Sequence, residues 1–378
     1  QKKGAIMDEV NLPIVRCVSC GLPYPVEQTP FRCKCGGVYD FYQFPSYTVP
    51  ETAAPGSLWQ YHSSLGLSDE APVVSLGEGG TPLLSGKFNG HQVYYKLESQ
   101  NPTGSYKDRG SAVLASFLCS RKVTSAVEDS SGNAGASLAA YCARAGIQVR
   151  IFIPESASGP KRWQIEMFGA QVEHVPGPRA NAAKAVLEAV HTGSVYASHA
   201  YMPFGLTGIA TIAYEIVQSL GKTPGTIIAP VGHGGLLYGV MLGFEAMQAA
   251  GRISKLPFFI GVQAEACAPA VRAYEAQSAE MPEIEPGVTL AEGASVVRPV
   301  RAGQIVRRML GGSGKMVSVT EVSLREAYNL AAKQGIFVEP TACLPLATLL
   351  NDKIEVDEPV IAILSGSGLK TNTISQTE

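Results

Sequence analysis

The sequence predicts an α/β protein with two open, mostly parallel sheet domains covered by helices on both faces, and a small cysteine-bearing ribbon at the N-terminus. Short apolar runs typical of buried strands alternate with amphipathic stretches typical of helices over most of the chain. This alternation indicates parallel strands joined by helical crossovers. The length of 378 residues fits two domains, and four of the eight cysteines cluster near the start.

The ribbon is predicted from two cysteine pairs that lie close to glycines. Cys17 and Cys20 are separated by two residues, and Cys33 and Cys35 by one. Thiolates carried on two tight turns are typical of a tetrahedral zinc site, so zinc is a candidate ligand. The alternative is four reduced thiols that hold no metal. We expect a zinc-ribbon-like segment over residues 1–45, followed by a linker rich in Pro, Gly and Ser.

The elements of the two sheets follow from the apolar periodicity. The small domain is expected over residues 106–205, and the large domain over 46–105 together with 206–378. Strands are expected at 92–98, 148–156, 171–176 and 258–265, a strand, turn and helix within 124–146, strands entering glycine-rich turns at 226–235 and 359–368, and helices at 107–121, 160–170, 180–193, 207–221, 236–251 and 324–335.

The charge pattern excludes several classes of function. The net charge is −2 and Lys and Arg are scattered, which argues against nucleic-acid binding. We find no apolar run long enough to span a bilayer, and the first fifteen residues lack an apolar signal core. Eight cysteines in a chain of this length do not make a disulfide scaffold. A protein of the reducing cytoplasm, with no membrane or nucleic-acid partner, is the expectation.

One lysine is presented by an unusual run of small and turn-forming residues, NPTGSYKDRG at 101–110. Lys107 falls at the expected start of a helix, where the helix dipole disfavours the ammonium form. A neutral amine is what Schiff-base chemistry requires. The alternative is a surface ion pair between Lys107 and Asp108.

Three further loops are expected at the carboxyl ends of strands, where doubly wound sheets bind ligands. SSGNAG offers hydroxyls and backbone amides at a helix start, which suits a carboxylate-sized anion, although a plain helix cap would look similar. PVGHGGLLYG could hold a phosphate through its backbone amides, with His233 contributing its backbone rather than its ring. ILSGSGLK ends an apolar strand with Ser365 at its tip, or is a simple turn.

Taken in order, NPTGSYKDRG, SSGNAG, VGHGG and SGSGLK resemble the threonine synthase branch of the fold-type II (tryptophan synthase β-like) pyridoxal-phosphate enzymes. The resemblance covers about residues 70–370, and the N-terminus resembles the ribbon of some threonine synthases and cysteate synthases. It implies pyridoxal phosphate as cofactor and a homodimer acting on a small amino-acid substrate.

The resemblance also assigns roles to residues. Lys107 is then the Schiff-base lysine and the acid/base for substrate protons, Asn133 bonds the cofactor's 3-oxygen, and Ser365 faces the pyridine nitrogen. The cofactor phosphate is held by backbone amides of Gly232, His233, Gly234, Gly235 and Leu236, and the substrate carboxylate by Ser130, Ser131, Gly132, Asn133 and Ala134.

The substrate is where this chain departs from the pattern. Threonine synthases commonly carry an Asn-Pro-x-Arg and Gly-Gln-Lys-Thr pattern that helps to hold a phosphorylated substrate. The corresponding stretch, YASHAYMPFGLTGIATIAYEI, has neither arginine nor lysine. Lys161 and Arg162 are the nearest cations, and we expect Arg162 to bind the substrate. AEGASV at 291–296 resembles dehydratase relatives, and Glu292 is a candidate to face the cofactor.

Three functions follow as hypotheses. The first is threonine synthesis from O-phosphohomoserine and water. The second is β-elimination or β-replacement on a serine-type substrate, as in a dehydratase or a cysteate or cysteine synthase. The third is a non-catalytic protein that binds partners through its ribbon.

Overall fold

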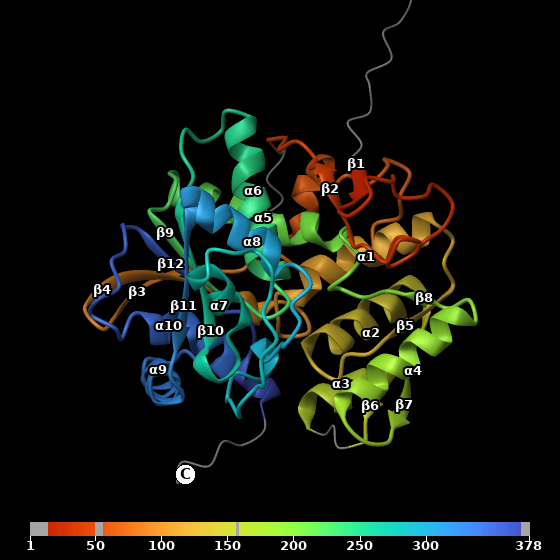
Figure 1. Cartoon of the computed structure of the whole chain (residues 1–378). Helices are drawn as coiled ribbons and strands as arrows, with labels where there is room; N and C mark the ends of the chain where they lie inside the picture. Colours follow the sequence, from red (N-terminus) through yellow and green to blue (C-terminus); the bar gives the residue numbers. More distant parts are fainter. Residues whose placement is uncertain (1–13, 50–55, 156–158, 372–378) are drawn as a thin grey trace, which may run out of the picture.

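The computed structural model describes residues 14–49, 56–155 and 159–371. It contains a two-stranded ribbon, a six-stranded sheet and a four-stranded sheet. The two larger sheets lie on opposite sides of the molecule, and the ribbon lies at one end beside α1 and α6 (Figure 1). The predicted fold class is therefore confirmed. Residues 1–13 of the expected ribbon segment lie outside the described residues.

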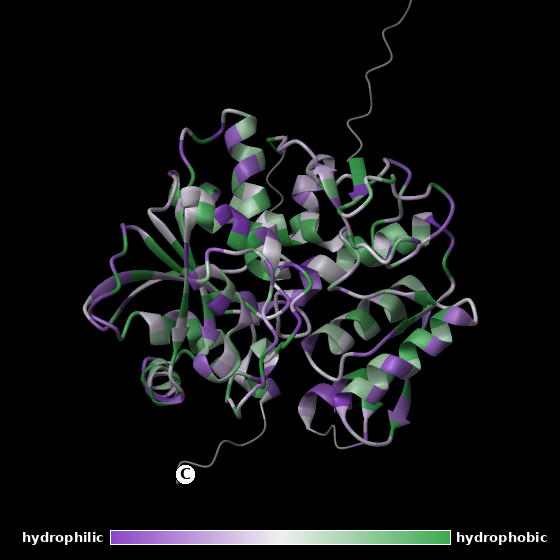
Figure 2. Ribbon diagram, viewed as in Figure 1, coloured by the Kyte–Doolittle hydropathy of each residue, from purple (hydrophilic) through white to green (hydrophobic). Residues whose placement is uncertain are grey.

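The six-stranded sheet is parallel except at its antiparallel edge strand β3. Its central strands β9 and β12 are buried along their whole length, as expected for strands covered by helices on both faces. Hydrophobic residues concentrate on the strands and on the helix faces that cover them (Figure 2). In spatial order the strands are β11 (Gly314–Val319), β10 (Phe258–Ala264), β9 (Thr226–Pro230), β12 (Val360–Ile363), β4 (His91–Lys96) and β3 (Leu83–Phe88).

The four-stranded sheet is parallel throughout. All of its strands fall between residues 125 and 196, within the expected small domain. The domain boundaries themselves remain a proposal, because α1 packs on α2 of this sheet and on α5 of the other. In spatial order the strands are β7 (Gln171–Val175), β6 (Gln148–Pro154), β5 (Ser125–Glu128) and β8 (Val195–Tyr196).

The helices begin and end near the expected positions, and close packing between them depends on glycine. A side chain at Gly208 would collide with the backbone of Arg109, and one at Gly243 with the backbone of Ala210, so α1, α5 and α6 can approach closely. The helices are α1 (Lys107–Ser120), α2 (Asn133–Ala145), α3 (Pro160–Met167), α4 (Arg179–His191), α5 (Gly205–Leu220), α6 (Gly235–Ala249), α7 (Pro269–Glu275), α8 (Ala302–Arg308), α9 (Glu321–Lys333) and α10 (Leu344–Thr348).

A buried ionic network joins α1 to the large sheet. The Arg109 guanidinium is inaccessible to solvent and donates two hydrogen bonds to each of two carboxylates, Glu98 at 2.8 Å and Glu215 at 2.6–2.8 Å. Lys96 of β4 adds a second cation, with its Nζ 2.6 Å from Glu215. Burial would raise the pKa of Glu215, but the charges of Arg109 and Lys96 outweigh it and hold that pKa at about 2. The network fixes α1 against β4 and α5.

The ribbon consists of β1 (Ile14–Cys17) and β2 (Tyr39–Gln43), and it contacts both halves of the molecule. Asp40 is buried, accepts a hydrogen bond from Tyr238 of α6 at 3.0 Å and pairs with Arg301 at 3.3 Å. Arg301 in turn donates to the carbonyl oxygens of Ala200 at 3.1 Å and Tyr201 at 2.6 Å. The ribbon is thus joined to the segment that follows β8 and to the large domain.

We predict that Arg109→Met lowers the free energy of unfolding by about 3–5 kcal/mol, because Glu98 and Glu215 would be left buried without their main partner. The contribution of Glu215 is fully present above its ordinary pKa of 4.5 and is lost as the pH falls toward its folded value of about 2. The deficit should therefore shrink between pH 5 and pH 2. Urea unfolding at several pH values measures it.

Arg298→Met serves as the control for this experiment. Arg298 pairs with Glu283 at 2.9 Å, but both side chains are highly exposed, so its loss should change stability little. Equal effects of the two substitutions would contradict the proposed weight of the buried network.

Candidate active site

A cavity of about 790 Å³ lies between the two sheets, at the carboxyl ends of their strands. Its walls come from the loops after β5, β9 and β12 and from the start of α1, which are the four loops that the sequence singles out. Parallel strands place their following loops at one edge, so segments more than 200 residues apart in the chain meet here. The expected residues that line it are Lys107, Ser130, Ser131, Gly132, Asn133, Ala134, Gly232, His233, Leu236, Glu292 and Ser365.

Lys107 is the first residue of α1, and its Nζ lies 4.8 Å from the centre of the Tyr106 ring. The preceding turn is held by Asp108, whose carboxylate accepts hydrogen bonds from the backbone N and the Oγ1 of Thr103, both at 2.6 Å. Asp108 is buried and used within its own loop, so the surface ion pair with Lys107 is not what the structure shows. The backbone N of Tyr106 also donates to the carbonyl oxygen of Ser365 at 3.0 Å, which ties this loop to the one after β12.

The glycine-rich loop after β9 leads into the N-terminus of α6. Gly234 has φ of +94°, and a side chain there would meet the backbone of Arg301 and Ala302 at about 3.0 Å. The carbonyl oxygen of His233 accepts from the backbone N of Arg301 at 2.8 Å. The first amides of a helix have no partners within it, so this loop presents free donors. Gly234 and Gly235 belong to the loop without lining the cavity wall.

Two buried polar atoms in the wall have no hydrogen-bond partner within the described ranges. They are the Oγ of Ser365 and the Oδ1 of Asn133. The Nδ2 of Asn133 instead donates to both carboxylate oxygens of Glu339 at 3.0 Å. Glu339 also pairs with Lys161 at 3.2 Å. The amide group expected to address the cofactor's 3-oxygen is therefore engaged by a carboxylate that sequence reasoning missed, because Glu339 follows no recognisable motif.

A histidine-rich end of the cavity was also missed from the sequence. His199 and His233 lie with ring centres 5.7 Å apart, and the Nδ1 of His199 is 3.2 Å from the Oε1 of Glu128. Arg179, at the start of α4, lines the same wall. A second cavity of about 500 Å³ adjoins this end, and Arg179, His199 and His233 border both cavities.

Burial and nearby charge set the protonation of this end. Burial lowers the pKa of His199 well below its usual range, and the charges of Lys107, His233 and Arg179 act in the same direction. Burial, with Lys107 and Arg179, also lowers the pKa of His233 to about 3. Burial and Asp129 raise the pKa of Glu128 well above its usual range, against the opposing charges of Lys107 and Arg179. Neutral imidazoles and a protonated carboxyl group are therefore favoured near neutral pH.

The two cations proposed for the substrate are placed differently. Lys161 lines the cavity, whereas Arg162 does not and pairs with Glu166 at 2.9 Å one turn along α3. The structure therefore does not bring Arg162 into the cavity wall. Arg179 takes its place as the arginine of the wall, and it has no ion-pair or hydrogen-bond partner within the described part of the chain. A lone arginine after Gly-Pro carries no sequence signal for such a role.

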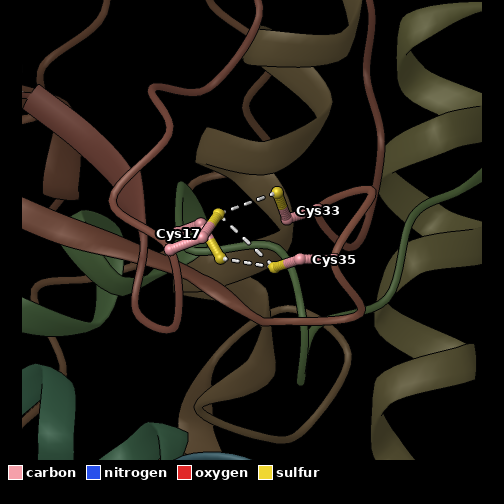
Figure 3. A group of neighbouring side chains, drawn as sticks. Cys17, Cys33 and Cys35 are labelled. Atoms are coloured by element: carbon pink, nitrogen blue, oxygen red, sulfur yellow. Dashed lines mark hydrogen bonds between the residues drawn. The ribbon is translucent and has the colours of Figure 1, made fainter.

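The four cysteines of the ribbon come together (Figure 3). Their sulfur atoms all lie within 4.8 Å of one another, with contacts of 3.5 Å between Cys17 and Cys35, 3.6 Å between Cys20 and Cys33, and 3.4 Å between Cys20 and Cys35. A tetrahedron with Zn–S bonds of about 2.3 Å has edges of about 3.8 Å. A side chain at Gly37 would collide with the Sγ of Cys17. The irregular second pair is therefore compatible with a four-thiolate site.

The family model for pyridoxal-phosphate dependent enzymes matches residues 74–366. The chain therefore belongs to this family, and its cofactor is pyridoxal phosphate. Its curated relatives include threonine synthases. The one from Methanocaldococcus jannaschii is 34% identical over 94% of this chain and 92% of its own, and the one from Methanosarcina acetivorans is 32% identical over the same shares.

Solved structures confirm the fold. Maize serine racemase matches with a TM-score of 0.68 at 20% identity, covering 76% of this chain and 88% of its own. A bacterial-type threonine deaminase, designated T.th., matches with a TM-score of 0.65 at 26% identity, covering 78% of this chain and 94% of its own. Among the described residues, no helix is both long and apolar enough to cross a membrane.

The residues of the cavity fit pyridoxal phosphate. The hydroxyl of Ser365 is buried and unpaired, as a group that meets a ring nitrogen would be. Gly232 and Gly234 leave no space for side chains, so a phosphate could approach the backbone amides of the loop. Lys107 lies in the same wall.

We predict that borohydride reduction of the protein loaded with pyridoxal phosphate leaves a covalent adduct on the peptide that contains Lys107. Lys107→Ala should fold, because this side chain is only half-buried, but should form no adduct and lose several orders of magnitude in activity. Peptide mapping by mass spectrometry locates the adduct. An adduct on Lys161 or Lys370, which line the same cavity, would contradict the assignment.

Proposed function

We propose that the protein is a threonine synthase that converts O-phosphohomoserine and water to threonine and phosphate. The relatives named threonine synthase support the reaction, and the observation that carries the substrate class is Arg179. An arginine without a partner among the described residues, in a cavity wall, is suited to a dianion such as a phosphate ester, to which it can donate two hydrogen bonds. The substrate's phosphate would then lie at the histidine-rich end.

The remaining roles are proposed from placement. Lys107 holds the cofactor and moves protons at the substrate's carbon atoms, and the amides of the loop from Gly232 to Leu236 hold the cofactor's phosphate. The stretch from Ser130 to Ala134, at the start of α2, binds the substrate carboxylate. Pyridoxal phosphate supplies an electron sink when bound. Ser365, as a neutral hydroxyl, would meet the ring nitrogen without forcing its protonation.

Asn133 is proposed to address the cofactor only together with Glu339. The carboxylate orients the amide by two hydrogen bonds, and Lys161 balances its charge. Lys161 is therefore committed to Glu339, which leaves Arg179 as the better partner for an incoming phosphate.

The alternative is β-elimination or β-replacement on a serine-type substrate. The missing arginine in the stretch after β8 favours it, and such a substrate needs no dianion site. Under this alternative Arg179 would have no substrate partner.

We predict that Arg179→Gln raises the KM for O-phosphohomoserine about 10–100-fold, the loss expected for charge-assisted hydrogen bonds of about 1.5–3 kcal/mol. Inhibition by inorganic phosphate should weaken in parallel. Arg162→Gln, which removes a nearby arginine outside the cavity wall, is the matched control and should change neither value. Released phosphate and threonine are measured.

Two results would redirect this proposal. A larger effect of Arg162→Gln than of Arg179→Gln would restore Arg162 as the substrate arginine. Oxoacid formation from serine or threonine, without phosphate release from O-phosphohomoserine, would establish the β-elimination reaction.

We further propose that the ribbon binds zinc and that the enzyme works in the cytoplasm as a homodimer. The four convergent sulfur atoms support zinc. Cys20 and Cys35 are exposed free thiols, which suits a reducing compartment. The homodimer rests on the family resemblance.

We predict about one zinc per chain by metal analysis of the purified protein, as four thiolates around one ion require. Cys20→Ser should reduce the bound metal, whereas Cys267→Ser, a buried cysteine far along the chain, should not. Metal-free protein with an intact ribbon would support four reduced thiols instead.

A further inference from the structure

Glu128 and His199 form a pair that none of the roles above uses. Glu128 ends β5 with its side chain 1% exposed, and His199 follows β8 with its side chain 26% exposed. The Nδ1 of His199 meets the Oε1 of Glu128 at 3.2 Å, while the Oε2 of Glu128 is buried without a partner among the described residues. His199 lines the cavity, and within that part of the chain no side chain or backbone group bonds its Nε2.

The groups around the pair come from five elements. Lys107 begins α1, Arg179 begins α4, His233 follows β9, and Asp129 follows β5 and accepts a hydrogen bond from Tyr196 of β8 at 2.7 Å. Together they favour a protonated Glu128 beside a neutral His199. In that state Glu128 donates to Nδ1, and the proton of the imidazole sits on Nε2, which faces the cavity.

The reaction proposed above needs a proton at this place. A phosphate ester is mostly a dianion at pH 7, since its second pKa is about 6. Breaking its carbon–oxygen bond without a proton would release the trianion, which is a far stronger base than hydrogen phosphate. A general acid beside the bridging oxygen removes this cost.

We propose that His199 is the general acid for the leaving phosphate and that Glu128 resupplies its proton, an inference that rests on the proposed synthase function. As the bond between the γ-carbon and the bridging oxygen breaks, that oxygen keeps the electron pair and takes the proton from Nε2 of His199. The carboxyl proton of Glu128 moves to Nδ1. Hydrogen phosphate leaves, and a Glu128 carboxylate remains beside a neutral imidazole.

The pair is reset by the water that the reaction consumes. The water oxygen bonds to the β-carbon, and one of its protons passes to Nε2 while the Nδ1 proton returns to Glu128. One proton leaves the pair and one returns in each turnover, so the pair needs no further reactant.

Glu128→Gln tests the resupply of the proton. The glutamine amide can still donate to Nδ1 and keep the ring in place, but it has no proton to transfer. At pH 8 we expect kcat for phosphate release to fall about 100-fold or more, with KM and cofactor content nearly unchanged. The deficit should shrink as the pH falls to about 5.5, because the substrate monoanion then carries its own proton. A merely structural role would not produce this pH-dependent rescue.

His199→Gln should show the same pH-dependent rescue and keeps the test open if Glu128→Gln does not fold. His174→Gln, which alters an exposed histidine of β7 outside the cavity, is the control and should leave the profile unchanged. Nitrogen-15 NMR provides a readout independent of activity, and should find the His199 proton on Nε2 with Nδ1 as acceptor in the wild-type protein.

The outcomes separate this proposal from the function on which it rests. If the wild-type enzyme releases no phosphate from O-phosphohomoserine, both fail. If it does, and Glu128→Gln matches the wild type or loses the same factor at every pH, only the proton transfer is overturned. A His199 proton found on Nδ1 in the resting protein would overturn it as well.

Discussion

The site depends on the burial of Arg109. Two residues earlier in the chain, Lys107 must stand at the start of α1 with a defined position relative to the loops of both sheets. Arg109 achieves this by placing its charge among Glu98, Glu215 and Lys96, which belong to three other elements. Each of these buried charges is tolerable only while the others are in place. The register of α1, and with it the position of the lysine, is therefore fixed by electrostatics as well as by apolar packing.

The strands and helices of the core could be predicted from the sequence because their patterns are local. Buried parallel strands such as Val360–Ile363 are continuous apolar runs, and the helices show regular apolar spacing. The strands that were not predicted lack such a signal. Leu83–Phe88 is an exposed edge strand with a glycine inside it, Val195–Tyr196 has two residues, and Gly314–Val319 lies at the other edge of its sheet.

The candidate site divides along the same line. Its loops were found because glycine and serine at the end of a strand and the start of a helix have a physical meaning in the sequence. Arg179, Glu128 and Glu339 were not found, because each is an ordinary charged residue whose importance comes from its neighbours in space. Arg162 shows the same limit from the other side. It lies one residue from Lys161, but the helix turns it away from the cavity.

The ribbon has a consequence for how the cleft between the sheets can open. At one edge, Arg301 is almost fully buried and is held by Asp40 of the ribbon and by the carbonyl groups of Ala200 and Tyr201. At another, the sheets meet through Glu339 and a partly exposed Lys161. Separating the second contact costs less, because water can replace a half-exposed partner. The ribbon edge is therefore the pivot of the molecule, and substrate enters from the side of Glu339.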